Sequence, residues 1–342
     1  MSKRILLIYT GGTIGMTTDP TTGALTPLNF RDIYDEIPAL RRLHVDIEFH
    51  EGITPIDSSD VTPEGWREIA RVVRDSYTRF DGFVVLHGTD TMSYTASALS
   101  FMLENLSKPV VFTGSQIPIG VLRTDGRENL VTAVEIAATT RPDGSPMVPE
   151  VSVYFQKKLF RANRTTKWSA EQLNAFTSEN YPPLAEVGVS IRYNEAAIGY
   201  PQVRETELRI AEKLCRDVLV VRLFPGIEPA VLRAMLAIEG LRGVVLQTYG
   251  AGNTPTADWF FDILGEAIAR GIVVVNVTQC QAGGVQPIYA SGLRLTEAGV
   301  VSGRDMTSEA AVAKLMYVLG KNLSAEATLA LLNESLRGEF AC

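Results

Sequence analysis

The chain has 342 residues, of which 46% are hydrophobic and 21% are charged, a composition typical of a globular protein with enough length for two domains. The 39 acidic side chains outnumber the 32 basic ones, so the formal net charge is −7. This excess of acid argues against a nucleic-acid partner, which would favour a basic surface.

Short apolar runs alternate with longer amphipathic segments, which is the pattern of an α/β fold with a parallel sheet. Several runs are β-branched on both faces, as strands that helices cover on both sides require. In chain order, the predicted strands are Ile5–Tyr9, Phe83–His87, Val110–Thr113, Val151–Phe155, Val218–Phe224, Val244–Tyr249 and Ile272–Val277.

The predicted helices lie between these strands. Thr62 and Pro63 are typical of an N-cap and a first helical position, and apolar residues follow at helical spacing from Trp66 to Phe80. The other predicted helices are Thr91–Leu106, Gly126–Ala138, Glu228–Glu239, Ala257–Arg270, Ser308–Leu319 and Ser324–Leu336.

The segment from Asn194 to Arg216 is more polar than its surroundings and contains Gly199-Tyr200-Pro201. We interpret residues 194–216 as a linker between a larger N-terminal catalytic domain, residues 1–193, and a smaller C-terminal α/β domain, residues 217–342.

The three cysteines lie far apart and lack the spacing of metal ligands, as expected in a reducing compartment. The N-terminal apolar run Ile5–Tyr9 is too short for the hydrophobic region of a signal peptide. No segment approaches the ~20 apolar residues of a membrane helix. We therefore expect a cytoplasmic protein without a membrane partner.

A glycine cluster, Thr10-Gly11-Gly12-Thr13-Ile14-Gly15, follows the first predicted strand. Such a cluster fits a tight turn or a phosphate-binding loop. However, the dinucleotide fingerprint requires glycine where Thr10 stands, and the Gly-Lys-Ser/Thr ending of a P-loop is absent. What remains is the hydroxyl of Thr13 at the carboxyl end of a strand, the edge at which open α/β sheets bind ligands.

Three further motifs carry polar side chains, and each has a structural alternative. In His87-Gly88-Thr89-Asp90-Thr91, a threonine and an aspartate precede a helix, where they also fit an ordinary N-cap. Asp57-Ser58-Ser59-Asp60 also fits a capping loop before the helix at Thr62. Lys167 ends the polar run from Arg161, and a lysine in such a loop is usually only solvated.

Together, these four motifs resemble the L-asparaginase family, and they are most similar to its cytosolic type I branch. The resemblance spans nearly the whole chain. It is carried by Thr10-Gly11-Gly12-Thr13-Ile14, Asp57–Asp60, His87–Thr91, Ala96–Leu106, Asn163–Lys167 and Leu336-Arg337-Gly338-Glu339.

The resemblance implies an amidohydrolase that converts L-asparagine and water to L-aspartate and ammonia, with a weak glutaminase side activity. In the family, the residue matching Thr13 attacks the side-chain amide and forms a β-aspartyl ester. The residues matching Thr89, Asp90 and Lys167 form a second catalytic group. A threonine hydroxyl needs a neighbouring base to become a nucleophile, and Lys167 is the base that these motifs offer. The reaction needs no metal or other cofactor.

The resemblance also implies how the substrate is bound. Ser58 and Ser59 would hold its α-carboxylate, and Asp90 would pair with its α-ammonium group. Backbone amides near Gly88 and in the turn around Ser115 would stabilise the developing oxyanion. The implied substrate-binding residues are Asp57, Ser58, Ser59, Gly88, Thr89, Asp90 and Ser115.

The implied fold is a flavodoxin-like N-terminal domain with a smaller α/β C-terminal domain. The implied assembly is a homotetramer built as a dimer of dimers. The sequence departs from the family at two places. Residues 19–27 lack the tyrosine that many members place in the loop after the glycine motif. In addition, Gln247 aligns with an arginine that some type I enzymes use in a second, allosteric asparagine site.

Two other functions share this fold. A non-catalytic amino-acid sensor would need a broken catalytic set, yet Thr13, Thr89, Asp90 and Lys167 are all present. An asparaginase-like subunit of a tRNA-dependent amidotransferase would carry an extra N-terminal domain, whereas here the glycine motif begins at Thr10. The acidic net charge also disfavours tRNA as a partner.

Overall fold

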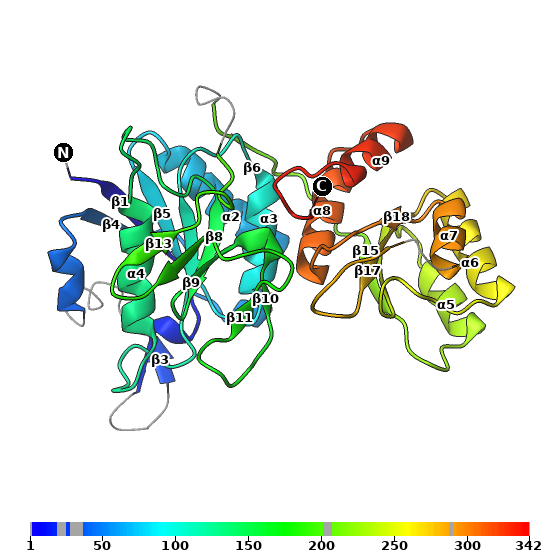
Figure 1. Cartoon of the computed structure of the whole chain (residues 1–342), viewed down its shortest axis with the longest axis horizontal. Coiled ribbons are helices and arrows are strands. Elements are labelled where there is room, and N and C mark those ends of the chain that lie inside the picture. Colours follow the sequence, from blue (N-terminus) through cyan, green and yellow to red (C-terminus); the bar gives the residue numbers. More distant parts are fainter. Residues whose placement is uncertain (1, 19–24, 28–36, 201–206, 287–289, 342) are drawn as a thin grey trace. The chain divides into compact units, whose positions relative to one another are not determined.

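A computed structural model describes residues 2–18, 25–27, 37–200, 207–286 and 290–341 of the chain (Figure 1). The chain divides into two compact units, Met1–Ile210 and Ala211–Cys342. The predicted linker, residues 194–216, contains this division. Within it, β14 (Arg209–Ile210) pairs antiparallel with β6 (Leu103–Glu104) of the first unit.

The first unit contains an eight-stranded mixed sheet in the order β13-β12-β9-β8-β7-β5-β1-β4. Its parallel part confirms the four strands predicted in this half of the chain and adds a fifth at the edge. The parallel strands are β1 (Arg4–Tyr9), β4 (Asp46–His50), β5 (Gly82–Leu86), β7 (Val110–Thr113) and β8 (Val151–Phe155).

Three antiparallel strands, which the sequence analysis did not predict, extend this sheet. They are β9 (Lys158–Arg161), β12 (Ala185–Val187) and β13 (Ile191–Tyr193). The chain reverses between β8 and β9 through Gln156 and Lys157, which both have a positive φ (43° and 71°). Two-residue hairpins favour this conformation, but glycine and asparagine usually provide it. The turn therefore had no recognisable signal in the sequence.

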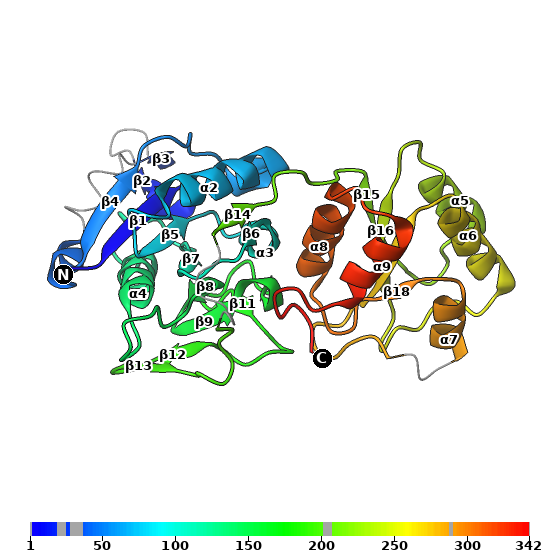
Figure 2. The ribbon, with the colours of Figure 1, turned by 90° about the horizontal axis from the view of Figure 1, so that it is seen from above.

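The helices of the first unit cover both faces of the sheet. Figure 2 shows α4 (Gly126–Ala138) on one face, and α2 (Pro63–Ser76) and α3 (Met92–Met102) on the other. Thr62 and Pro63 begin α2 as predicted. The prediction that α3 continues to Leu106 was wrong, because residues 103–104 leave the helix to pair with β14.

The second unit is built on a four-stranded parallel sheet in the order β15-β16-β17-β18. The first three strands, β15 (Val218–Arg222), β16 (Gly243–Thr248) and β17 (Val273–Thr278), were predicted, whereas β18 (Val301–Ser302) was not. Helices again cover both faces (Figure 2). They are α5 (Pro229–Leu236), α6 (Asp258–Ala269), α7 (Ala290–Glu297), α8 (Ser308–Gly320) and α9 (Ala325–Asn333).

A fully buried ion pair fastens the C-terminal segment of the second unit to α8. The Lys314 Nζ lies 2.6 Å from the Glu339 Oε1, and both side chains are completely buried. Lys314 also donates to the backbone oxygens of Leu332 and Glu334, at 3.0 and 2.5 Å. The carboxylate of Glu339 accepts the backbone N–H groups of residues 336 and 337. Hydrogen bonds thus satisfy both charges, as buried ions require.

None of the helices within the described residues is both long enough and apolar enough to span a membrane.

Candidate active site

The carboxyl ends of β1 and β5 bring two of the predicted motifs side by side. The two strands pair in parallel up to Tyr9 and Leu86. Beyond them, the backbone N–H and the hydroxyl of Thr10 both donate to the Leu86 carbonyl oxygen, each at 3.0 Å. The loop that carries Thr13 and the loop that carries Thr89 therefore leave the sheet as neighbours.

Glycines allow these loops to touch through their backbones. Gly12 has φ 87°, and a Cβ added to it would overlap the backbone of Gly88. A Cβ added to Gly88 would lie 2.5 Å from the Ser58 Oγ. Side chains at either position would push the loops apart. Because these glycines have no side chains, the motifs that contain Thr13, Thr89 and Ser58 can pack against one another.

Thr13 is the first residue of a short 3₁₀ helix, η1 (Thr13–Gly15), and its side chain is partly exposed. The next residue, Ile14, is fully buried. The loop at the carboxyl edge of the sheet thus combines a buried isoleucine with a threonine that is partly exposed.

Lys167 contacts two of the other three predicted catalytic residues, Thr89 and Asp90. It lies in the short strand β10 (Thr166–Lys167), and its Nζ donates to the Thr89 Oγ1 at 2.8 Å and to the Asp90 Oδ1 at 2.7 Å. Thr89 is buried, whereas the Asp90 side chain is 69% exposed. The structure therefore brings the amine of Lys167 to a hydroxyl and a carboxylate that lie more than seventy residues earlier in the sequence.

Sequence reasoning missed a fourth member of this cluster, Gln116. The hydroxyl of Thr89 donates to the Gln116 Oε1 at 3.1 Å. The preceding Thr113-Gly114-Ser115 turn was recognised, but a single glutamine after it carries no signal of its own.

The Asp57–Asp60 motif forms a second 3₁₀ helix, η3 (Ser58–Asp60), with Asp57 as its N-cap. The Asp57 carboxylate accepts the Ser59 backbone N–H at 2.8 Å and also the Ser59 hydroxyl. These bonds, first from the hydroxyl and then from the backbone, lower the pKa of Asp57. Ser58 is buried, and its carbonyl accepts the Thr91 hydroxyl at 2.7 Å. The capping interpretation and a binding role are therefore compatible.

His87 is buried directly beneath the site. Its Nδ1 lies 2.7 Å from the Gly88 carbonyl oxygen, which can only accept, so this nitrogen carries the proton. Burial lowers the pKa of His87 to about 4, and the imidazole is therefore neutral near pH 7. Its role is to hold the backbone at Gly88 rather than to carry charge.

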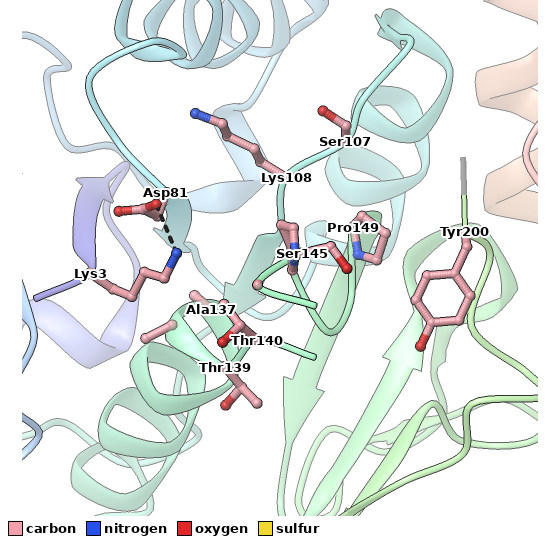
Figure 3. A pocket seen from close by; sticks show the side chains of 13 residues that line it. Lys3, Asp81, Ser107, Lys108, Ala137, Thr139, Thr140, Ser145, Pro149 and Tyr200 are labelled. Atoms are coloured by element: carbon pink, nitrogen blue, oxygen red, sulfur yellow. Dashed lines mark hydrogen bonds and ion pairs between the residues drawn. The ribbon is translucent and has the colours of Figure 1, made fainter. Parts of the chain in front are cut away.

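Two cavities in the first unit differ in their relation to this site. One of about 230 Å³ is lined by Thr10, Ile56, Ile69 and His87, among others, and lies at the carboxyl edge of the sheet. Another, of about 260 Å³, is shown in Figure 3. Lys3, Asp81 and Lys108 line it from positions just before β1, β5 and β7, so it lies at the opposite, amino edge.

The remaining predicted site residues are placed as follows. Ser115 is buried beside the start of α4. Gln247 lies in the second unit, where its Nε2 donates to the Ser308 Oγ at 2.7 Å.

Within the loop that lacks the tyrosine of other family members, residues 19–24 lie outside the described residues. Among the described residues, no group of three or more His, Cys, Asp or Glu side chains is arranged to hold a metal ion.

Comparison with known proteins shows which sequences and structures the chain resembles. The family model for the asparaginase N-terminal domain matches residues 4–199, and the model for the glutaminase/asparaginase C-terminal domain matches residues 217–332. L-asparaginase 1 from Escherichia coli (strain K12) is 44% identical over 352 residues, which cover 99% of this chain and 98% of that protein.

A solved structure and a longer protein are also similar to this chain. The crystal structure of L-asparaginase I from Vibrio cholerae O1 biovar eltor matches with a TM-score of 0.90 and 40% identity, covering 100% of both chains. The 60 kDa lysophospholipase from Mus musculus is 42% identical over 360 residues, which cover 99% of this chain but only 62% of that protein.

Proposed function

The chain belongs to the asparaginase family, and from this premise we propose that it hydrolyses L-asparagine to L-aspartate and ammonia. The observation that carries the proposal is the Lys167 Nζ within 2.8 Å of both Thr89 and Asp90. Thr89 and Asp90 stand on a loop whose backbone touches the loop of Thr13. The site thus combines the partly exposed Thr13 with a lysine and a carboxylate at one edge of the sheet.

Thr13 is the proposed nucleophile. Its Oγ1 attacks the side-chain amide carbon of asparagine, its proton passes to the leaving nitrogen, and the C–N bond breaks to release ammonia. The product on the protein is a β-aspartyl ester of Thr13. Water then attacks the ester carbon, the bond to Oγ1 breaks, a proton of this water restores the Thr13 hydroxyl, and aspartate leaves. The position of Thr13 at the start of η1, partly exposed at the carboxyl edge, supports this role.

Lys167 and Thr89 are the proposed proton-transfer group. The amine of Lys167 is the group that exchanges a proton with the reacting atoms, and the Thr89 hydroxyl, which accepts a hydrogen bond from this amine, holds it in place. Thr89 is buried and Lys167 is largely buried, which keeps bulk water from competing for these bonds.

Asp57, Ser58, Ser59 and Asp90 are the proposed groups that hold the charged ends of asparagine, with Gly88, Thr89 and Ser115 beside them. The exposed carboxylate of Asp90 is accessible to a substrate ammonium group. Ser58 packs against Gly88, which places the proposed carboxylate-binding segment next to the catalytic loop.

We further propose that the protein resides in the cytoplasm and assembles as a homotetramer, on the basis of its similarity to the cytosolic type I branch. Light scattering should then give a mass four times the 37.3 kDa of one chain. A monomeric mass at micromolar concentration would contradict the assembly.

Initial rates of ammonia release test the function directly. Purified protein is incubated with L-asparagine, L-glutamine or D-asparagine over a wide concentration range, and with lysophosphatidylcholine in a parallel assay for fatty-acid release. We expect turnover to be fastest with L-asparagine and absent in Thr13→Ala. Binding of L-asparagine without ammonia release would identify a sensor instead. Fatty-acid release as the main activity would also overturn the proposal.

A further inference from the structure

The side-chain amide of Gln116 contacts both the proposed catalytic cluster and the loop that follows Lys167. Its Nε2 donates to the backbone oxygens of Ala170 and Gln172, at 3.3 and 3.2 Å. Both acceptors lie in the connection between β10 and β11 (Phe176–Thr177). Its Oε1 lies 3.1 Å from the Thr89 Oγ1.

These contacts determine the direction of the Thr89 hydroxyl proton. Carbonyl oxygens only accept hydrogen bonds, so the amide nitrogen of Gln116 must face Ala170 and Gln172. The amide oxygen therefore faces Thr89 and, since it also only accepts, the hydroxyl must donate its single proton to it. This leaves the lone pairs of the hydroxyl for Lys167, which donates to it at 2.8 Å.

The backbone of Gln116 is held as firmly as its side chain. The buried carboxylate of Asp125 accepts the N–H groups of Gln116 and Ile117, both at 3.0 Å. Asn129 donates to the same carboxylate and, at 2.9 Å, to the carbonyl oxygen of Gly114. The turn that carries Gln116 is thus fixed from the start of α4, and its amide has a defined direction before substrate arrives.

We propose that Gln116 is a positioning residue for the amide hydrolysis, in which it directs the hydroxyl proton of Thr89 away from Lys167 and links Thr89 to the Lys167 loop. This inference rests on the proposed function. Without Gln116, the hydroxyl of Thr89 can rotate and donate elsewhere, so only part of the molecules holds the arrangement that accepts a hydrogen bond from Lys167. The groups proposed to hold the charged ends of asparagine are unchanged. The loss therefore falls on kcat rather than on KM.

The test compares steady-state kinetics with L-asparagine for the wild type and three variants. Gln116→Leu keeps the approximate volume but removes every polar contact, and we expect kcat to fall about tenfold with KM within about twofold of wild type. Gln116→Glu retains an acceptor oxygen toward Thr89, so it should recover part of the lost kcat. This rescue separates orientation of the hydroxyl from mere packing.

Gln279→Leu is the matched control. The Gln279 amide also donates to two backbone oxygens, those of Leu223 and Gln247, at 2.7 and 2.8 Å, but in the second unit. Its replacement removes the same kind of bonds and should lower the unfolding midpoint without a comparable loss of kcat.

Three results would overturn the inference while the proposed function stands. They are a Gln116→Leu kcat within twofold of an active wild type, a Gln116→Glu variant no faster than Gln116→Leu, and an equal loss of kcat in Gln279→Leu. A wild-type protein that releases no ammonia from L-asparagine overturns the proposed function, and the inference with it.

Discussion

Two lysine–carboxylate pairs, one in each unit, have nearly the same separation but very different surroundings. Lys167 and Asp90 lie 2.7 Å apart, with side chains that are 15% and 69% exposed. Lys314 and Glu339 lie 2.6 Å apart and are completely buried. Lys167 also donates a hydrogen bond to the hydroxyl of Thr89. The Lys314–Glu339 pair, in contrast, makes further hydrogen bonds to backbone carbonyl and N–H groups.

The difference in burial and in hydrogen-bond partners separates the proposed catalytic pair from a structural one. Burial lowers the pKa of Lys314, while the charge of Glu339 and its hydrogen bond act in the opposite direction. The Phe340 ring, with its centroid 4.5 Å from the Lys314 Nζ, and the backbone oxygens leave no accessible face for a substrate. At Lys167 the carboxylate partner faces solvent. The same ion pair can therefore fasten a chain end or serve a reaction, depending on what surrounds it.

The largest expected effect concerns the residue that the Lys167 pair is proposed to serve. Thr13→Ala should lower kcat by roughly 10⁴-fold or more, because it removes the hydroxyl that forms the ester. Its unfolding midpoint should remain close to that of the wild type. Thr13→Ser, which keeps a hydroxyl, should retain measurable ammonia release. Near-normal turnover by Thr13→Ala would move the nucleophile to Thr89.

Lys167→Met tests the reactive pair itself. We expect a loss of about 10²- to 10⁴-fold in kcat, since the variant removes the proposed proton-transfer group, with little change in stability. Asp90→Ala should instead affect both KM and kcat, because it also removes the proposed ammonium contact. If Lys167→Met kept more than about a tenth of the wild-type kcat, equivalent to ~1.4 kcal/mol, the lysine would be structural.

Lys314→Met tests the buried pair and should give the reverse result. The variant leaves the Glu339 carboxylate buried without its partner, which should lower the free energy of unfolding by about 3–5 kcal/mol. The kcat per folded molecule should stay near that of the wild type. In the double variant Lys314→Met/Glu339→Gln, which removes both charges, part of the stability should return. Urea unfolding measures these differences, and an unchanged midpoint in Lys314→Met would contradict the structural role.

His87, at the carboxyl edge of the first sheet, is a second buried group whose pKa is lowered by burial. Its pKa of about 4 in the folded protein is below the ordinary value of 6.5, so the unfolded chain binds a proton first as the pH falls. The stability that neutral His87 contributes is complete above pH 6.5 and is lost between pH 6.5 and 4, by about 3 kcal/mol at most.

Urea unfolding at several pH values measures this effect in the wild type, in His87→Gln and in the exposed control His44→Gln. The dependence on pH should become shallower in His87→Gln alone. An equal change in His44→Gln would assign the acid sensitivity to charge in general.

The smallest expected effect concerns Gln247, a neutral side chain where an allosteric site would require a cation. Its amide donates to Ser308 and cannot offer a carboxylate two charge-assisted bonds. Compared with an arginine at this position, Gln247 should weaken the binding of asparagine at an allosteric site by about 1–2 kcal/mol, roughly five- to thirty-fold. We therefore expect hyperbolic or weakly sigmoidal kinetics with L-asparagine. A Hill coefficient clearly above 1.5 would contradict this expectation, and Gln247→Arg provides the complementary gain-of-charge variant.

The sequence was sufficient for the central strands and for the motifs, because both depend on local signals. The run Phe83–His87 is apolar up to Leu86, and the pair Thr62-Pro63 marks a helix start. The edge strand β4 was missed because polar and apolar residues alternate along Asp46–His50, and because the strand remains partly exposed. Helix α3 was predicted too long because its end depends on β14, more than a hundred residues away.

The candidate site could be predicted only in part, for a similar reason. Family resemblance supplied Thr13, Thr89, Asp90 and Lys167 by name, but not their contacts. Gln116 escaped notice because its role depends on two backbone oxygens in a distant loop. The sequence does not show where a backbone carbonyl points.

The contact between Gly12 and Gly88 also constrains any attempt to redesign this protein for a substrate of another size. Here the spacing of the two loops is set by main chain against main chain, which has no rotamers to adjust. A larger residue at either position would shift the whole loop rather than reshape the pocket, and no smaller residue exists. Engineering of substrate size is therefore better directed to the Asp57–Ser59 segment, whose side chains are the ones proposed to hold the substrate.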